Sequence, residues 1–292
     1  MADAKRVTSS ASSTTTDQYW DALMSVAAGD DRRRQTLERS RLFEQEAERY
    51  DRRRPGYPDA VIDAVLGPEP SGLEVLDVGC GTGLAARQMA ERGAKVLGVE
   101  LAPGMADIAH RRGTSVEIAP FEDWDAAGRV FDLVVSAQAW HWLDIGAATA
   151  KAASLLRPSA RLGLIWSGGA HPDDLADALE DVYSTLVPNG THNLFRGYAA
   201  HRSSDVRAGL DGVVDAIVVS PEFAGPTEEW FPWTHCYQTD EWLDLLLTNS
   251  QYVALEANLR LRLFDAVRAT IDDYGGSFVM NFETVLIAAT RL

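Results

Sequence analysis

The sequence predicts an α/β protein built on a doubly wound, mostly parallel sheet. Strand-like apolar runs alternate with helical stretches from Leu73 to Ser167. Such alternation is typical of βαβ units, whose strands run parallel. The first of these runs ends in a glycine-rich turn that leads directly into a helix, and Gly113, Gly128 and Pro158 mark later turns.

The region before the first strand is expected to contain an arm followed by helices. Residues 1–16 are rich in Ser and Thr and carry no apolar segment, which predicts a disordered arm. Residues 17–66 hold apolar residues at helical spacing, interrupted by the turn RPGYP. We expect this second region to form a helical cap or lid over the main domain, residues 67–292.

Five strands are expected in the first half of the main domain: LEVLDVG, AKVLGVEL, SVEIAP, FDLVVSAQ and ARLGLIWS. The helices predicted between them include LAARQMAERG, APGMADIAHRRG and AATAKAASLLRP. Residues from about 167 to 275 are expected to elaborate the acceptor side of a single core. Helices are predicted there at HPDDLADALEDVYSTL, DEWLDLLLTNS and ALEANLRLRLFDAVRATIDDYGG, and extended segments at DGVVDAIVVSPEF and EEWFPWTHCYQT, with a final strand at SFVMNFETVLIAATR.

The composition argues against several classes of partner. The 292 residues carry a formal net charge of -16, which disfavours nucleic acid and anionic membrane surfaces. Two cysteines without a CxxC motif fit a reducing compartment, and no run of about 18 apolar residues is present, so we expect a cytoplasmic protein. The six histidines show no metal-ligand spacing, so no metal site is expected.

The segment Asp77-Val-Gly-Cys-Gly-Thr-Gly83 is the strongest functional signal. It follows a strand and precedes a helix, and Glu100 ends the next strand 21 residues after Gly79. Glycines let the backbone approach a large ligand, and an acid at this distance can bind ribose hydroxyls. The G-x-G-x-G spacing with a preceding carboxylate favours the cationic S-adenosylmethionine (SAM) over a nicotinamide dinucleotide.

Residues 42–143 resemble SAM-dependent class I methyltransferases of the type 11, trans-aconitate-methyltransferase-like group. The resemblance rests on YDRRRPGYP, VLDVGCGTG, VLGVELAPGM, FEDWD and FDLVVSAQAWHWLD, and less specifically on FPWTHCYQTDEWLDLLLTNSQYVAL and ETVLIAATR. It implies a Rossmann-like sheet of seven strands whose last strand is antiparallel. It also implies SAM as methyl donor and S-adenosylhomocysteine as product.

The resemblance assigns roles around the donor. The methionine part would be held by Asp77, Gly79, Gly81 and Gly83, and Cys80 and Thr82 of the same loop would also bind the cofactor. Glu100 would hold the ribose, and Leu101, Met105, Phe121 and Glu122 the adenine. Ala137, Gln138 and His141 would line the methyl end.

The candidate catalytic residues are His141 and Tyr50. His141 is expected either to act as a general base or to form a polar wall. Substrate contacts are expected from Tyr19, Arg54, Tyr57, Trp142, Trp166 and Trp233. For the tryptophans, core packing is the alternative. For Tyr50, Arg54 and Tyr57, the alternative is a solvated basic turn.

We therefore expect SAM-dependent methyl transfer to a small organic acceptor by in-line displacement, in a monomer or homodimer. The acceptor group is left open between a carboxylate, a hydroxyl, an amine and an activated carbon. Two other hypotheses stay open at this point: a dehydrogenase that uses the same glycine loop, and a noncatalytic ligand-binding module.

Overall fold

The computed structural model describes residues 34, 37–38, 40–41, 46–187 and 203–292. The expected arm at residues 1–16 and the candidate substrate residue Tyr19 lie outside the described residues. Of the region expected to form a cap, the structure describes residues 34, 37–38, 40–41 and 46–66, which include α3 (Ala47–Arg53) and α4 (Asp59–Leu66).

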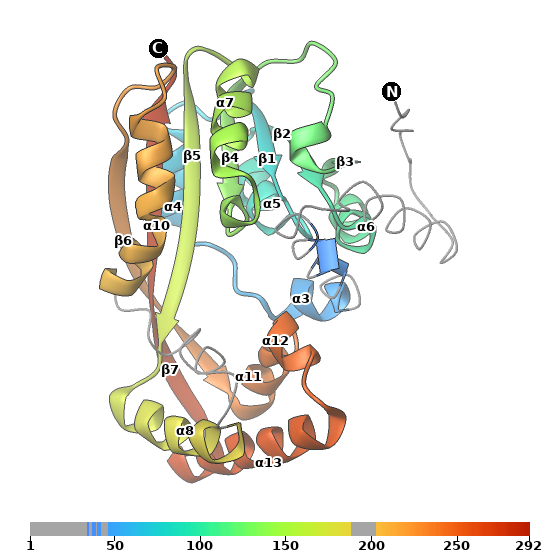
Figure 1. The fold of residues 1–292 in the computed structure, drawn as a ribbon, viewed down its shortest axis with the longest axis vertical. Coiled ribbons are helices and arrows are strands. Elements are labelled where there is room, and N and C mark those ends of the chain that lie inside the picture. Colours follow the sequence, from blue (N-terminus) through green and yellow to red (C-terminus); the bar gives the residue numbers. More distant parts are fainter. Residues whose placement is uncertain (1–33, 35–36, 39, 42–45, 188–202) are drawn as a thin grey trace.

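A seven-stranded sheet forms the centre of the molecule (Figure 1). Its order is β3-β2-β1-β4-β5-β7-β6, and β7 is antiparallel to both of its neighbours. This confirms the predicted doubly wound α/β sheet with an antiparallel last strand. The strands are β1 (Glu74–Val78), β2 (Lys95–Glu100), β3 (Ser115–Ile118), β4 (Phe131–Ala137), β5 (Leu156–Ala170), β6 (Thr227–Gln238) and β7 (Ser277–Thr290).

Helices cover both faces of this sheet because successive strand residues point to opposite sides. In β1, Val75 packs with α4 and α5 (Leu84–Glu91), whereas Leu76 and Val78 pack with α7 (Ile145–Leu155) and α10 (Ser203–Val218). The two resulting apolar layers are buried and hold the sheet rigid between them. Helix α6 (Pro103–Arg111) packs beside β2 and β3 at the sheet edge.

The extended segment predicted at DGVVDAIVVSPEF is wrong, because most of it belongs to α10. Its β-branched residues suit a strand, but Leu210, Val213 and Ile217 also recur at helical spacing. All three are buried against the sheet. Tertiary packing on the sheet face therefore overrides the local preference for an extended chain.

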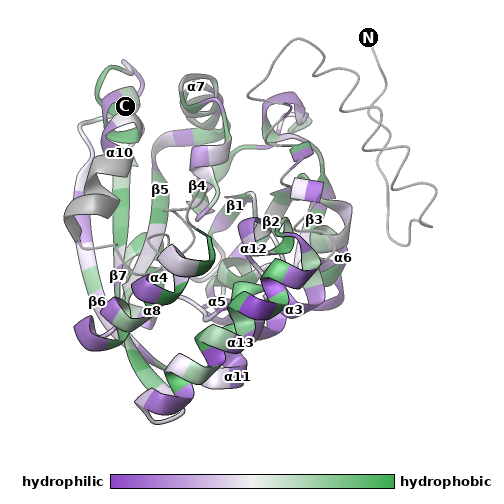
Figure 2. Ribbon diagram, turned by 60° about the horizontal axis from the view of Figure 1, so that its bottom comes forward, coloured by the Kyte–Doolittle hydropathy of each residue, from purple (hydrophilic) through white to green (hydrophobic). Residues whose placement is uncertain are grey.

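A second apolar core lies beyond the carboxyl end of the sheet, contrary to the expectation of a single core. Long β5, β6 and β7 continue past their neighbours and meet α8 (Asp173–Leu186), α11 (Thr239–Leu246) and α13 (Ala257–Tyr274), as Figure 1 shows. Side chains from all three helices and from β6 and β7 form one buried cluster. Figure 2 shows the helices of this region alternating hydrophobic and hydrophilic along their length, as expected when one face is buried.

Helix α3 bridges the two cores. The Asp51 carboxylate is buried and pairs with Arg87 of α5 at 2.9 Å and with Arg112 after α6 at 3.0 Å. On its other side, Arg53 pairs with Asp244 of α11 at 2.9 Å. The helix is therefore fixed to both parts of the chain.

Gly163 of β5 lies where no side chain fits, because an added Cβ would stand 2.3 Å from Val65 Cγ2. We expect Gly163→Ala to lower the free energy of unfolding by about 1–3 kcal/mol through overpacking. Urea denaturation measures this change. Gly212→Ala in α10 is the matched control: its Cβ meets nothing within 4 Å, and helix propensity predicts a gain of up to about 1 kcal/mol. Equal effects of the two variants would contradict the packing argument.

Candidate active site

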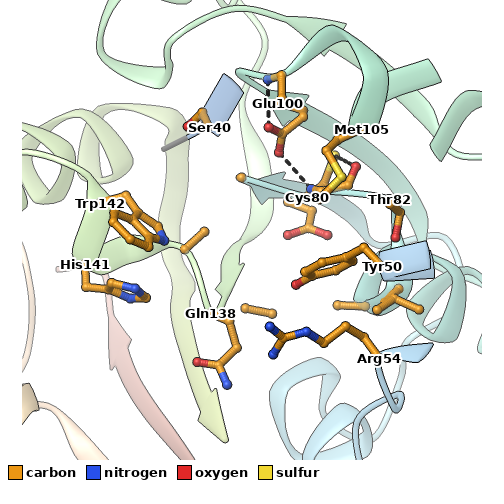
Figure 3. A pocket seen from close by; sticks show the side chains of 18 of the residues that line it. Ser40, Tyr50, Arg54, Cys80, Thr82, Glu100, Met105, Gln138, His141 and Trp142 are labelled. Carbon is orange, nitrogen blue, oxygen red and sulfur yellow. Dashed lines mark hydrogen bonds between the residues drawn. The ribbon is translucent and has the colours of Figure 1, made fainter. Parts of the chain in front are cut away.

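A cavity of about 660 Å³ opens where the carboxyl ends of β1, β2, β4 and β5 face α3 and the second core. Parallel strands bring the residues after their carboxyl ends to one edge, where doubly wound sheets bind ligands. The close view in Figure 3 shows Glu100 at the upper right, Tyr50 and Arg54 at the lower right, Gln138 below the centre, and His141 and Trp142 at the left.

The glycine-rich loop forms the floor of the acidic end. Gly79 has φ +68°, and an added Cβ would stand 2.5 Å from Ala139 Cβ. Gly79, Cys80, Gly81 and Thr82 line the cavity as expected, whereas Gly83 does not. Gly83 instead begins α5 with φ +82°, where a Cβ would stand 2.8 Å from Thr114 Oγ1. Its structural role is close packing of the start of α5 against Ala109 of α6 and Thr114 in the turn after it.

Asp77, the last-but-one residue of β1, is 1% exposed and lines the cavity. Neither carboxylate oxygen has a hydrogen-bond partner within the described part of the chain. Burial, and secondarily the charge of Glu100, raises the pKa of Asp77 to about 7. A buried carboxylate at a cavity surface is stabilised when a cationic ligand supplies the missing charge.

Glu100 is also buried, but its carboxylate is bound on both oxygens. Gly81 N donates to Oε2 at 2.8 Å and Ala102 N donates to Oε1 at 2.8 Å. Burial raises the pKa of Glu100, and these backbone bonds oppose the shift. Each carboxylate oxygen still has a lone pair for a further donor, so a ribose hydroxyl can bind here.

The remaining donor-side candidates also surround the cavity. Leu101 and Met105 line it from the start of α6, and Phe121 and Glu122 from the short 3₁₀ helix η1 (Phe121–Asp123). Leu37 and Ser40 also line the cavity, and sequence reasoning did not single them out.

Gln138 follows β4 in a strained backbone conformation, with φ +59°. Its backbone N–H donates to Ile165 O at 2.8 Å, and its side-chain amide donates to Ser167 O at 2.5 Å. These bonds to β5 hold the strain in place beside Ala137, and both residues line the cavity. Strained non-glycine residues of this kind cluster at functional sites.

His141 lies on η2 (Trp140–Trp142) and lines the cavity together with Trp142. Its Nδ1 accepts a hydrogen bond of 3.2 Å from Nε1 of Trp166. Trp166 is 7% exposed and is not among the cavity-lining residues, so it contacts His141 from the core. Trp233 does line the cavity, where its ring stacks on Phe282 at 4.3 Å.

Helix α3 and the segment after it bring Tyr50, Arg54 and Tyr57 to the cavity. The Arg54 guanidinium lies 5.0 Å from the centre of the Tyr50 ring, and its Nε donates to Thr248 Oγ1 at 3.0 Å. Among the described residues that line the cavity, Arg54 is the only Lys or Arg, whereas Asp77, Glu100, Glu122 and Asp144 are acidic.

Several lining residues at the acceptor end were not singled out from the sequence: Gly168, Gly169, Tyr237, Leu245, Asn249, Gln251 and Phe282. The two glycines could have been found, since they follow the apolar part of β5 at its carboxyl end. The others come from β6, β7 and the second core, and no local motif marks them.

Comparisons with known proteins agree with this geometry. Residues 75–159 match the model of a methyltransferase domain. An uncharacterized methyltransferase of Mycobacterium tuberculosis is 27% identical over 254 residues, covering 82% of this chain and 92% of that protein. A ubiquinone biosynthesis O-methyltransferase of a Methylobacterium species is 34% identical over 140 residues, covering 44% of this chain and 55% of that protein. The fold is similar to a solved structure from Anaeromyxobacter dehalogenans proposed to be a type II methyltransferase, with a TM-score of 0.54, 23% identity, and coverage of 80% of this chain and 97% of that one.

The fold and the matched domain define this chain as a methyltransferase of class I, an enzyme whose methyl donor is SAM. The buried Asp77 carboxylate, the open glycine loop and Glu100 fit that cationic adenosyl compound. When bound, SAM supplies a methyl group on a positively charged sulfur.

Two negative findings apply to the described residues alone. No group of three His, Cys, Asp or Glu side chains there could hold a metal ion. None of the helices in that part is both long enough and apolar enough to cross a membrane.

The affinity for SAM should depend on the ionisation of Asp77. Because its pKa is about 7 in the ligand-free protein, affinity should rise between pH 6 and pH 8 as the carboxylate becomes charged. Asp77→Asn should weaken binding about tenfold or more and flatten this rise. Isothermal titration calorimetry measures both. Asp59→Asn, at a side chain 83% exposed, is the matched control and should leave the pH profile unchanged.

The Asp77 carboxyl group also makes the free energy of unfolding depend on pH in a defined direction. Its pKa is 3.8 in the unfolded chain and about 7 in the folded one, so the folded state binds more protons between these values. The free energy of unfolding of the ligand-free enzyme should contain a contribution that falls as pH rises from about 4 to about 7. Asp77→Asn should remove it in chemical denaturation, and an unchanged slope would contradict the assignment.

Proposed function

We propose that this enzyme methylates a small organic acid, with an apolar or aromatic body, on oxygen. The observation that carries the proposal is the separation of charge in the cavity: acids gather around the donor end, and Arg54 supplies the positive charge nearer the acceptor end. A cationic guanidinium in a partly buried site favours a carboxylate.

The shape and chemistry of the acceptor end support a compact, partly aromatic acceptor. Trp142, Trp233, Tyr237 and Phe282 line it, and Gly169 leaves room for Phe282, whose ring would stand 2.7 Å from an added Cβ. Apolar walls with a few fixed polar groups are typical of small-molecule sites. The resemblance to the trans-aconitate-methyltransferase-like group supports a carboxylic acid, and the name of the ubiquinone biosynthesis relative supports an oxygen nucleophile.

We propose that Tyr50, Arg54 and Tyr57 close the cavity over the acceptor, as part of a cap formed by the region before residue 67. The anchoring of α3 on both sides supports this role, since it holds the segment at the cavity mouth. In this proposal the residues of the chain position the acceptor and exclude water, which can suffice for an in-line displacement.

The first experiment is calorimetric titration of the full chain with SAM, S-adenosylhomocysteine and NAD. Binding of the first two and not of NAD is expected. An acceptor screen then follows S-adenosylhomocysteine release with aromatic and aliphatic carboxylic acids and their amides. Turnover of acids but not amides supports the proposal, whereas turnover of amines or neutral phenols alone would overturn it. Binding of SAM without turnover of any of the acids would also overturn the proposal.

Arg54→Gln should raise the KM for the carboxylic acid about tenfold, because the bond to its carboxylate is lost while the donor site is intact. The affinity for SAM should stay within about twofold. Steady-state kinetics and calorimetry measure the two quantities. Arg52→Gln, two residues earlier in α3, is the matched control, since the Arg52 side chain is 57% exposed and does not line the cavity. An unchanged KM in Arg54→Gln would exclude Arg54 as the carboxylate partner.

A further inference from the structure

The contact between Trp166 and His141 determines which imidazole nitrogen carries the proton. An indole Nε1 is a hydrogen-bond donor only, so His141 Nδ1 must be the acceptor in the 3.2 Å bond. A nitrogen that accepts a hydrogen bond carries no proton. In this geometry the imidazole is therefore neutral and its single proton is on Nε2.

Trp166, the hydrogen-bond donor, is held rigidly. Trp166 lies in β5 between β4 and β7, paired in register with Val285, and is 7% exposed within the main apolar core. His141 follows Trp140, which is 0% exposed, so the backbone of η2 is also fixed by the core. The indole N–H therefore reaches His141 from the buried side, while the imidazole lines the cavity (Figure 3).

This arrangement limits the chemistry open to His141. A general base must accept the acceptor's proton on a nitrogen with a free lone pair, and here the Nδ1 lone pair is engaged by Trp166 while Nε2 already carries a proton. The cavity-facing ring can instead donate a hydrogen bond from Nε2. Such a donor suits an acceptor oxygen that is already ionised.

We propose that Trp166 is a positioning residue that holds neutral His141 in the Nε2–H tautomer, so that His141 donates a hydrogen bond to a carboxylate oxygen of the acceptor and does not remove a proton. This inference rests on the proposed function. Methylation of a carboxylate forms one bond from the methyl carbon to oxygen and breaks the bond from that carbon to sulfur, whose electron pair stays on sulfur. The carboxylate charge and the sulfonium charge cancel, and no proton leaves.

The tautomer can be measured without an acceptor. We would record ¹⁵N–¹H long-range correlation spectra of histidine-labelled full-length protein, saturated with S-adenosylhomocysteine, at pH 8, above the usual titration range of histidine. His141→Gln identifies the His141 signals among the six histidines. The expected spectrum has a protonated Nε2 and an unprotonated Nδ1. Trp166→Phe should shift this pattern toward a mixture of tautomers.

Trp124→Phe is the matched control. Trp124 is 5% exposed and its Nε1 also donates to a side chain, Glu117, at 2.7 Å, but it is not among the cavity-lining residues. It should leave the His141 spectrum unchanged. A protonated Nδ1 in the wild-type protein, or a Trp166→Phe spectrum identical to wild type, would overturn the inference.

The second part of the proposal is the hydrogen bond from His141 to the acceptor carboxylate. We would test it by steady-state kinetics with the carboxylic acid that is turned over fastest in the screen. His141→Gln, which keeps an N–H donor, should retain kcat/KM within about tenfold, and His141→Ala should lose more, mainly through KM. Trp166→Phe should raise KM about threefold to tenfold. Loss of about a hundredfold or more in kcat for both His141 variants would indicate a general base and sink the donor role. Absence of any methylated carboxylic acid would overturn the proposed function and the acceptor contact, whereas the tautomer is decided by the spectra alone.

Discussion

The Glu100 carboxylate is the interaction on which the donor end depends. By accepting from Gly81 N and Ala102 N it joins the glycine loop after β1 to the start of α6 after β2. These bonds use an acid to satisfy backbone amides that a ligand-binding loop would otherwise leave without partners. The consequence is a second negative charge beside Asp77, which lacks a partner in the described residues. The donor end thus carries negative charge that the described residues do not balance. The positively charged sulfonium and amino groups of SAM balance it.

The sheet, and which residues line the acidic end of the cavity, could be predicted because both depend on local signals. Asp77 and Glu100 lie at the carboxyl ends of β1 and β2 and the glycines follow β1, and parallel strands bring such residues to one edge whatever the loops do. Gly83 is the exception: its spacing fits the motif, yet its φ of +82° and its proximity to Thr114 serve helix packing and not the cavity wall. Trp166 is a second exception, because it does not line the cavity either. An alternating strand pattern cannot tell whether a tryptophan reaches the cavity or only contacts a residue that lines it.

The acceptor end could not be predicted in the same way. Much of its wall comes from β6, β7 and the second core, and the lining residues there, such as Trp233 and Phe282, lie 150 residues or more beyond the glycine loop. Which side chains meet there depends on the length of β5, on the antiparallel register of β7 and on the helical state of residues 203–218. The hydrophobic pattern of that last segment suits a strand or a helix, so only packing against the sheet decides between them.

The donor end and the acceptor end of the cavity are connected by the opposite charges of the molecules proposed to bind there. A cationic methyl donor and an anionic acceptor attract each other once water is excluded, so a protein that binds both needs to orient them more than to activate them. Arg54 follows a helix whose Asp51 is bonded to Arg87, and Arg87 in turn donates to Thr82 O of the glycine loop at 2.6 Å. The position of the acceptor's proposed partner is therefore coupled through two bonds to the loop proposed to hold the donor. A histidine whose Nδ1 is occupied by a core tryptophan adds a directional donor without adding charge, which leaves the charge on the acceptor oxygen available for the methyl carbon.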